Sequence, residues 1–232
     1  MKLKQSVTNV VRGTLLLLGV IALMATFMVQ SGTASAHSGN AYVRVVHASP
    51  AAGPVDVYVD GSKLLNDFTF SSVTDYVAVP AGSHRIQVAP DGKGRGASVI
   101  DVTVWLNCGT YYTAAALGTK DSGFSLKAFV DHNWLPDSKA KVRVYHLSPN
   151  AGPVDVAVGG KTVISGLNYK HASGYLTVDP GSYKFDVTAV NAGVTIPLSA
   201  HLKEGYVYSV FAVGLYQGSP ALQFAVAAFD AD

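Results

Sequence analysis

Residues 43–61 read VRVVHASPAAGPVDVYVDG, and residues 142–160 read VRVYHLSPNAGPVDVAVGG. The second segment repeats the first at a constant spacing of 99 residues. Solenoid and propeller repeats recur every 20 to 50 residues or so, and each copy here is therefore the size of a domain. The duplicated segment predicts a tandem of two similar domains.

The match continues through the rest of each copy. Residues 109–118 resemble residues 205–214, and near the chain end Phe129-Val130-Asp131 corresponds loosely to Phe229-Asp230. These matches divide the chain into a leader and two repeats, at residues 1–36, 37–135 and 136–232.

Within one copy, short runs rich in β-branched and aromatic residues alternate with turn residues such as Asp60-Gly61 and Asn107-Cys108-Gly109. Such spacing is typical of antiparallel sandwiches. The fold class is therefore predicted to be all-β, with two tandem antiparallel β-sandwiches of either the immunoglobulin-like or the transthyretin-like kind. The strands expected in the first copy are 41–48, 54–60, 73–79, 83–89, 97–105, 110–117 and 124–130.

The first 36 residues have the three parts of a secretory signal peptide. Lys2 and Lys4 give a basic start, an apolar helical run follows over residues 15–29, and the segment ends in Ala34-Ser35-Ala36. Cleavage is expected after Ala36. The alternative is an uncleaved anchor, but the run of 15 residues is short of the ~20 that span a bilayer. The membrane is thus expected to be a transient contact made through the leader.

Charge and cysteine content exclude some partners. The formal net charge is +2, and no Lys/Arg cluster lies outside the leader, so no nucleic-acid interface is expected. Cys108 is the only cysteine, which rules out an internal disulfide. It is either an exposed thiol without a partner or the site of an intermolecular disulfide that makes a homodimer.

The spacing of the duplicated segment suggests that residues 43–48 and 54–60 pair as an antiparallel hairpin. Because side chains alternate faces along a strand, Val43, Val45 and His47 would then face the core. Arg44 would lie on the opposite face, diagonal to Asp56. Arg44 would thus be within reach of an ion pair with Asp56 or a cation–π contact with Tyr58, and only the arginine and the aspartate are common to both copies.

The inward His47 is expected to be buried, with one ring nitrogen bonded to the loop backbone near Ser49 or Gly53. A metal site would need three or four converging ligands. A Ser49–His47–Asp56 triad would need Asp56 on the face of His47, and no nucleophile elbow is present. No catalytic, cofactor or metal residue is therefore assigned. The shared positions, interpreted as structural, are Arg44, His47, Ser49, Pro50 and Asp56, with Arg143, His146, Ser148, Pro149 and Asp155.

Several aromatic residues form a second candidate site. They would either stack on a sugar or pack in the core and between the copies, and packing is the expected role, with Trp134 as a wedge between the copies. The residues concerned are Trp105, Trp134, Tyr111, Tyr112, Tyr169 and Tyr175.

Residues 43–50, followed by Val55-Asp56-Val57-Tyr58-Val59-Asp60-Gly61, resemble the signature of the bacterial "domain of unknown function 4397" family. Residues 142–160 resemble it as well, so the resemblance covers nearly all of the chain after the leader. It implies an exported bacterial protein, secreted or held at the cell surface. The family has no assigned activity to carry over.

Three classes of function remain open at this point. The first is a non-catalytic surface or extracellular module with a structural or adhesive role. The second is a module that binds carbohydrate, peptide or another envelope component through loops at the sandwich ends. The third is an enzyme, which would need His47, Ser49 and Asp56 to converge. The first is the expected class, with cell-envelope components or glycans as the candidate partners.

Overall fold

A computed structural model describes residues 39–50, 52–136 and 138–231. The predicted signal peptide lies outside these residues. The chain divides into two units, residues 1–36 and residues 37–232. Regular structure in the described part consists of strands and two short 3₁₀ turns, η2 (Arg95–Ala97) and η3 (Val190–Ala192). None of the described segments is a helix with the length and apolar character to cross a membrane.

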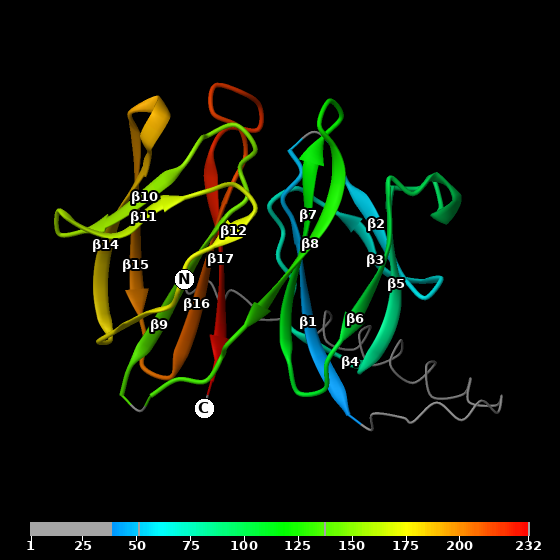
Figure 1. The fold of residues 1–232 in the computed structure, drawn as a ribbon, viewed down its shortest axis with the longest axis horizontal. Coiled ribbons are helices and arrows are strands. Elements are labelled where there is room, and N and C mark those ends of the chain that lie inside the picture. The colour runs from blue at the N-terminus through cyan, green and yellow to red at the C-terminus, as the bar shows by residue number, and fades with distance from the viewer. Residues whose placement is uncertain (1–38, 51, 137, 232) are drawn as a thin grey trace, which may run out of the picture. The chain divides into compact units, whose positions relative to one another are not determined.

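The first copy forms two four-stranded sheets (Figure 1). One sheet has the order β4-β1-β7-β8 and the other has the order β3-β2-β5-β6. The strands are β1 (Asn40–His47), β2 (Val55–Val59), β3 (Ser62–Phe68), β4 (Val77–Pro80), β5 (Gly82–Pro90), β6 (Ile100–Leu106), β7 (Tyr111–Thr119) and β8 (Gly123–Asp131).

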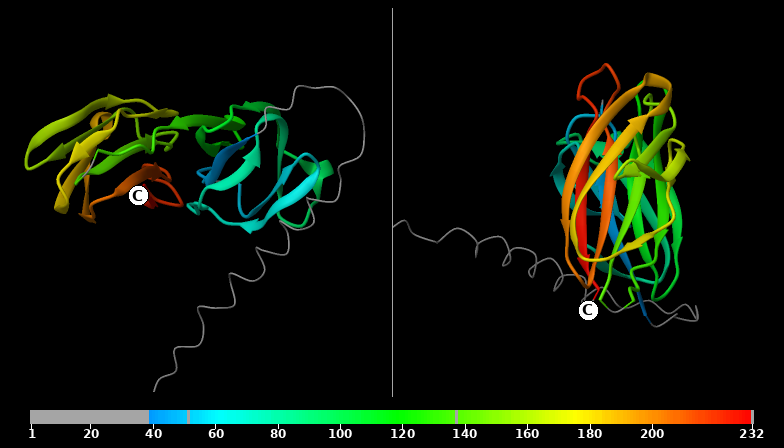
Figure 2. Two further views of the ribbon diagram at one scale, coloured as in Figure 1. Left: turned by 90° about the horizontal axis from the view of Figure 1, so that it is seen from below. Right: turned by 90° about the vertical axis from the view of Figure 1, so that its left-hand side faces the viewer.

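The second copy repeats this arrangement strand for strand, and Figure 2 shows its layers from two further directions. Its sheets have the orders β12-β9-β16-β17 and β11-β10-β14-β15, and β13 also pairs with β9. The strands are β9 (Ala140–His146), β10 (Val154–Val158), β11 (Lys161–Leu167), β12 (His171–Ala172), β13 (Leu176–Val178), β14 (Gly181–Ala189), β15 (Val194–Leu202), β16 (Tyr206–Val213) and β17 (Gln223–Asp230).

The strand order decides between the two topologies that the sequence leaves open. Lettered A to H in chain order, the strands of the first copy form the sheets D-A-G-H and C-B-E-F, and the second copy has the same order when β12 and β13 together count as strand D. An immunoglobulin constant-type sandwich has the sheets A-B-E-D and C-F-G. The observed order is therefore not the immunoglobulin one, and of the two predicted kinds the transthyretin-like one remains. The all-β sandwich prediction is confirmed, with one correction: β1 pairs with β7, and β9 with β16, in parallel.

Two strand predictions differ from the structure. The strand β3 was not expected, because its sequence SKLLNDF lacks an apolar alternation and most of its residues are at least partly exposed at a sheet edge. Asp60 and Gly61 precede it with φ of 49° and 85°, the conformation of a tight hairpin turn. The expected strand 73–79 is reduced to β4, and Val73 makes only an isolated bridge to Val46.

The predicted hairpin between residues 43–48 and 54–60 is wrong. The strand β1 pairs with β4 and β7, whereas β2 pairs with β3 and β5 in the other sheet. The expected inward faces still hold, because the inner-face valines of β1 and β2 line one space between the two sheets. Alternation along a strand determines which side chains face inward, but it does not determine which strand is the neighbour.

The outer face of β1 does not meet solvent. It belongs to an apolar cluster that joins the two copies and that we call the inter-copy cluster. Its buried members come from the β4-β1-β7-β8 sheet of the first copy and from the β12-β9-β16-β17 sheet of the second. They are Val46, Ala48, Ala115, Leu117 and Phe129, with Tyr145, Leu147, Phe211 and Val213.

Candidate functional site

The duplicated histidine is a buried support for the loop that follows it. His47 has no exposed surface, and its Nε2 lies 2.8 Å from the carbonyl oxygen of Gly53. His146, also fully buried, repeats the contact with Gly152 at 2.6 Å. Burial and the loop contact agree with the expectation from sequence. In each copy the histidine is the last residue of its strand: His47 ends β1, and His146 ends β9.

Burial lowers the pKa of His47 and of His146, because the charged imidazolium loses its hydration. The unfolded chain then binds protons that the folded histidines exclude. The stability that they contribute is present above pH 6.5 and is lost as the pH falls from that value toward the lowered folded pKa, with a slope of at most about 1.4 kcal/mol per pH unit for each histidine.

We expect His47→Gln to weaken the acid dependence of stability. Urea unfolding of the wild type should show a fall between pH 7.5 and pH 5.5, and the variant should lose about 1 kcal/mol less over that interval. His146→Gln should change the pH dependence in the same direction, since His146 is also fully buried and makes the same contact with its loop carbonyl. An unaltered pH dependence in both variants would contradict this account.

The serine of the motif holds the end of the neighbouring strand. Ser49 Oγ donates to the carbonyl oxygen of Gly118 at 2.7 Å, and Ser148 Oγ donates to that of Gly214 at the same distance. Pro50, which follows Ser49, is buried, and Pro149 is half-buried. These serines are therefore occupied by structural hydrogen bonds.

We expect Gly118→Ala to destabilise the fold by about 2–3 kcal/mol. Its φ is +102°, and a Cβ there would collide with the carbonyl oxygen of Gly123. Gly109→Ala is the matched control, because Gly109 also has a positive φ, +69°, but has open space around it. The control should cost about 1 kcal/mol. Chemical denaturation of both variants measures the difference, and equal losses would refute the steric argument.

The expected pairing of Arg44 with Asp56 is not found. Asp56 is buried and accepts a hydrogen bond from Lys63 Nζ at 2.7 Å, which together with the charge of Lys63 lowers the pKa of the Asp56 carboxyl. In the second copy, Asp155 accepts from the backbone N–H of Gly166 at 2.7 Å. The prediction fails because β1 and β2 belong to different sheets.

The side chains of Ser49, His47 and Asp56 do not form a catalytic chain. Nδ1 of His47 accepts from the backbone N–H of Ser49 at 3.3 Å, while the hydroxyl of Ser49 is bonded elsewhere. Within the described ranges, no group of three His, Cys, Asp or Glu side chains is arranged to hold a metal ion.

Arg44 instead points from β1 toward the second copy, into a buried polar network. Its Nε donates to Thr113 at 2.8 Å, and its Nη2 donates to Ser209 of the second copy at 2.6 Å. Asp131 lies 3.6 Å from Arg44 Nη2 and 3.0 Å from Arg143 Nη1. Its side chain has no exposed surface. The two arginines of the duplicated motif thus share one carboxylate, which comes from the first copy.

Three hydroxyl groups complete the network around Asp131. Tyr76 donates to its Oδ2 at 2.7 Å, and Thr113 and Tyr145 also donate to this carboxylate. Burial raises the pKa of Tyr76 and of Tyr145 above the usual range, so both phenols stay protonated donors. The carboxylate is therefore well satisfied despite its burial, as a buried charge must be.

The sequence did not single out Asp131, Thr113 or Ser209. Aligning the ends of the two copies suggests that Asp230 is the residue of the second copy equivalent to Asp131. The strand register shows that it is not. Asp131 pairs with Tyr111, and Phe229 occupies the equivalent place opposite Val207. A signal was available in the arginine: a charged residue between two valines of a strand needs a partner if the sheet it belongs to is covered on that face.

The two tryptophans are exposed, which corrects the expectation that they pack inside or between the copies. Trp105 on β6 is 62% exposed, and Trp134, in the segment between the copies, is 77% exposed. The Nζ of Lys141 lies over the Trp134 ring at 5.5 Å and over the Tyr175 ring at 5.0 Å. Trp134, Tyr175 and Lys141 are called the linker platform below.

The tyrosines of the same prediction do pack. Tyr111 stacks on Tyr42, with 4.6 Å between ring centroids, and meets Phe229 of the second copy edge-on. Tyr112 is buried, and Tyr169 lies against His146. Cys108 is an exposed free thiol, so the intermolecular disulfide stays a prediction.

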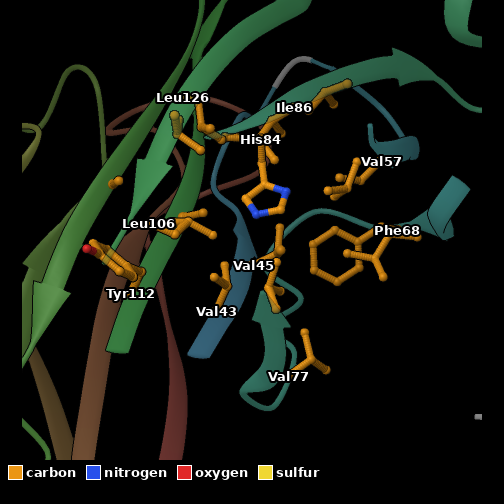
Figure 3. Close-up of a pocket in the computed structure, with 18 of the residues that line it drawn as sticks. Val43, Val45, Val57, Phe68, Val77, His84, Ile86, Leu106, Tyr112 and Leu126 are labelled. Carbon is orange, nitrogen blue, oxygen red and sulfur yellow. The ribbon is translucent and has the colours of Figure 1, made fainter. Parts of the chain in front are cut away.

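An apolar cavity lies between the sheets of the first copy (Figure 3). Its volume is about 60 Å³, and nearly all of its lining side chains are apolar. His84 on β5 is the exception: Figure 3 shows its ring among Val45, Ile86 and Leu126. Its nitrogens lie 2.7 Å from Asp60 Oδ2 and 2.8 Å from the carbonyl oxygen of Pro80.

Comparison with families of known sequence gives one match. A family model described as "Domain of unknown function (DUF4397)" matches residues 41–157 and residues 140–228. The first match covers the first copy and continues into the opening motif of the second, so that it overlaps the second match over residues 140–157. No curated protein matches the chain.

Solved structures show a distant likeness. A candidate cell adhesion protein from Bacteroides uniformis ATCC 8492 has 9% identity and a TM-score of 0.29, over 84% of this chain and 100% of the other. One from Bacteroides ovatus ATCC 8483 has 11% identity and a TM-score of 0.22, over 85% and 98%. The fimbrial anchor protein Mfa2 from Porphyromonas gingivalis has 10% identity and a TM-score of 0.22, over 82% and 98%. Likeness at this level carries no information about function.

Proposed function

Because the chain belongs to the family described as a domain of unknown function, DUF4397, whose description names no activity, we propose a function from its own residues. The protein is a non-catalytic module of the cell surface or extracellular space, with a structural or adhesive role. The leader and the resemblance to exported proteins support the location.

The observation that carries the non-catalytic role is the use made of the shared polar residues. His47 and Ser49 hold loops and strand ends, Asp56 is bound to Lys63, and Arg44 and Arg143 converge on Asp131. Each of these groups is engaged in an internal contact that fixes the architecture. A catalytic group would instead have to reach a substrate.

A second candidate function is a module that binds carbohydrate or peptide. The exposure of Trp105 and Trp134 favours it, since an exposed indole offers a flat apolar face to a ligand. Lys141 adds a cation beside the Trp134 ring. Within the linker platform, Trp134 is exposed and Tyr175 half-buried, whereas Lys141 is buried and donates to the Trp134 carbonyl, so the aromatic rings would make the contact with a ligand.

The first experiment tests location and attachment together. The full chain would be expressed with its leader in a bacterial host, and intact cells would be treated with external protease. Digestion of the protein on intact cells, or its recovery from the medium, is the expected result. Retention in a protected cytoplasmic pool would refute the proposal.

A binding assay separates the two candidates. The exported protein would be titrated with cell-wall glycans and envelope fractions, alongside Trp134→Ala, Trp105→Ala and a control, Val190→Ala, at another exposed apolar residue. Saturable glycan binding that is lost in one tryptophan variant alone would favour the binding module. Attachment to envelope fractions that all three variants retain would favour the structural or adhesive role.

A further inference from the structure

The two copies share one topology but fill the space between their sheets differently. Strand register matches Ile86 of the first copy with Phe185 of the second, because each lies opposite the last residue of its β2-equivalent strand. In the same way, Ala114 and Leu126 of the first copy match Val210 and Phe224 of the second. At all three positions the first copy has the smaller side chain.

The larger side chains of the second copy belong to its core. Phe185 and Val210 are buried there, and Phe224 packs against them. At two other positions the first copy has the larger side chain: Phe68 is equivalent to Leu167, and Val104 is equivalent to Ala200. They do not close the gap, because the cavity of about 60 Å³ remains in the first copy. The second copy has a smaller cavity between its sheets, of about 20 Å³, so the first copy keeps more space in the same fold.

The cavity approaches the surface at one edge of the sandwich. Its lining includes residues of β3 and β4, the edge strands of the two sheets on one side. Leu64, Phe68, Val77 and Val79 are half-buried there. At the opposite edge, β6 and β8 contact each other. Lining residues at that opposite edge, such as Val104 and Leu126, are half-buried as well, so the contact between strands decides, and a ligand would enter between β3 and β4.

The lining determines the chemistry of the ligand. Both nitrogens of His84 are engaged by Asp60 and Pro80, and the hydroxyl of Tyr112 accepts from the backbone N–H of Asn107 at 3.1 Å. These polar groups are thus already partnered, and the walls favour a wholly apolar group. Such a cavity stays dry unless an apolar group fills it.

The dimensions favour a chain over a ring. Val55, Val57 and Val59 all line the cavity, and they span about 13 Å along β2. A volume of about 60 Å³ spread along that length is narrow. A ring-binding cavity of comparable apolarity has about 150 Å³. As it stands, the cavity admits the end of an unbranched chain, and deeper entry requires the side chains at the β3–β4 edge to move apart.

We propose that the space between the sheets of the first copy binds the unbranched alkyl chain of a single-chain amphiphile of the fatty-acid class. The chain enters between β3 and β4, and its polar head stays in solvent. This inference goes beyond the proposed surface role and does not depend on it.

The test is displacement of cis-parinaric acid, a fluorescent unbranched fatty acid, from the exported protein. Hexanoate, octanoate and decanoate would be the competitors, each below its micellar concentration. Affinity should rise about threefold to fourfold for each added methylene until the cavity is full, as expected for burial of CH₂ groups. Absence of saturable binding, or binding that does not change with chain length, would overturn the proposal.

Substitutions that give one copy the residues of the other at equivalent positions test where the alkyl chain binds. Ile86→Phe with Leu126→Phe gives the first copy the residues of the second, and should weaken decanoate binding at least tenfold. Phe185→Ile with Phe224→Leu, the reciprocal change, should leave the first site intact. Ala114→Val is the milder filling variant if the double change impairs folding, which denaturation would show. Unchanged binding in a folded filling variant would refute the location.

Discussion

Replacing Asp131 with Ala should cost about 3–5 kcal/mol of folding stability, which is the range for breaking a buried ion pair by removing one partner. The substitution leaves the guanidinium of Arg44, which is 2% exposed, without a counter-charge, and Arg143 loses its contact at 3.0 Å. Tyr76, Thr113 and Tyr145 lose their shared acceptor at the same time. Urea denaturation is the appropriate measurement, because guanidinium chloride would add salt to an electrostatic comparison.

Asp131→Asn separates charge from shape. It keeps the volume of the side chain and an oxygen acceptor but removes the negative charge. We therefore expect it to restore only a small part of the folding stability that Asp131→Ala loses. Asp101→Asn is the control at the surface, where Asp101 pairs with Arg85 in an exposed ion pair. Exposed pairs contribute little, so this variant should unfold close to the wild type.

A double-mutant cycle tests whether the charges act together. Arg143→Met should destabilise the wild type more than it destabilises Asp131→Asn, because the arginine is no longer paired in the second background. Additive effects of the two substitutions would show that Asp131 and Arg143 are not coupled, and this ion pair would then have no role in joining the copies.

How far the sequence determined this site can be judged from particular residues. Alternation along residues 43–48 placed Val45 and His47 inward, and the structure agrees, because the period of a strand is a local property. The same argument assigned Arg44 to Asp56, which requires knowing the neighbouring strand. That neighbour is β7, from a segment about 70 residues later in the chain, and local spacing contains no information about it.

The expectations for the aromatic residues failed in part for a related reason. Trp105 lies on an edge strand, and Trp134 lies in the chain segment that connects the two copies. Both positions leave a large side chain partly in solvent. Composition predicts burial for an average tryptophan. Whether a given one is buried depends on which elements cover it, and Tyr111, which is held between Tyr42 and Phe229, shows the opposite outcome.

The inter-copy cluster also explains why the two copies are not interchangeable. Strand register pairs Val46 with Tyr145 as equivalent positions, Ala48 with Leu147, and Ala115 with Phe211. In each case the first copy has the smaller side chain and the second the larger one. The opposite holds at two positions, where Leu117 matches Val213 and Phe129 matches Ala227. The second copy therefore supplies most of the volume that the first copy lacks at this contact.

We expect Phe211→Ala to destabilise the protein by about 3–5 kcal/mol, the range for removing a buried phenylalanine from a packed core. Phe211 is fully buried, its ring centroid lies 4.7 Å from that of Tyr145, and the guanidinium of Arg44 lies 5.2 Å from its ring. The truncation removes apolar contacts between the copies and one wall of the polar network. Urea unfolding, followed by tyrosine absorbance and by circular dichroism, measures the loss.

Ala115→Phe makes the first copy resemble the second at this position and tests complementarity directly. If the copies are matched small against large, the added ring has no space, and the variant should lose about 1–3 kcal/mol through overpacking. Val226→Ala, on the half-exposed part of β17, is the control and should change stability by less than about 0.5 kcal/mol. Tolerance of Ala115→Phe together with a small effect of Phe211→Ala would mean that the copies are loosely joined. Large losses in both would mean that the duplicated sandwiches have specialised into two unlike halves of one contact.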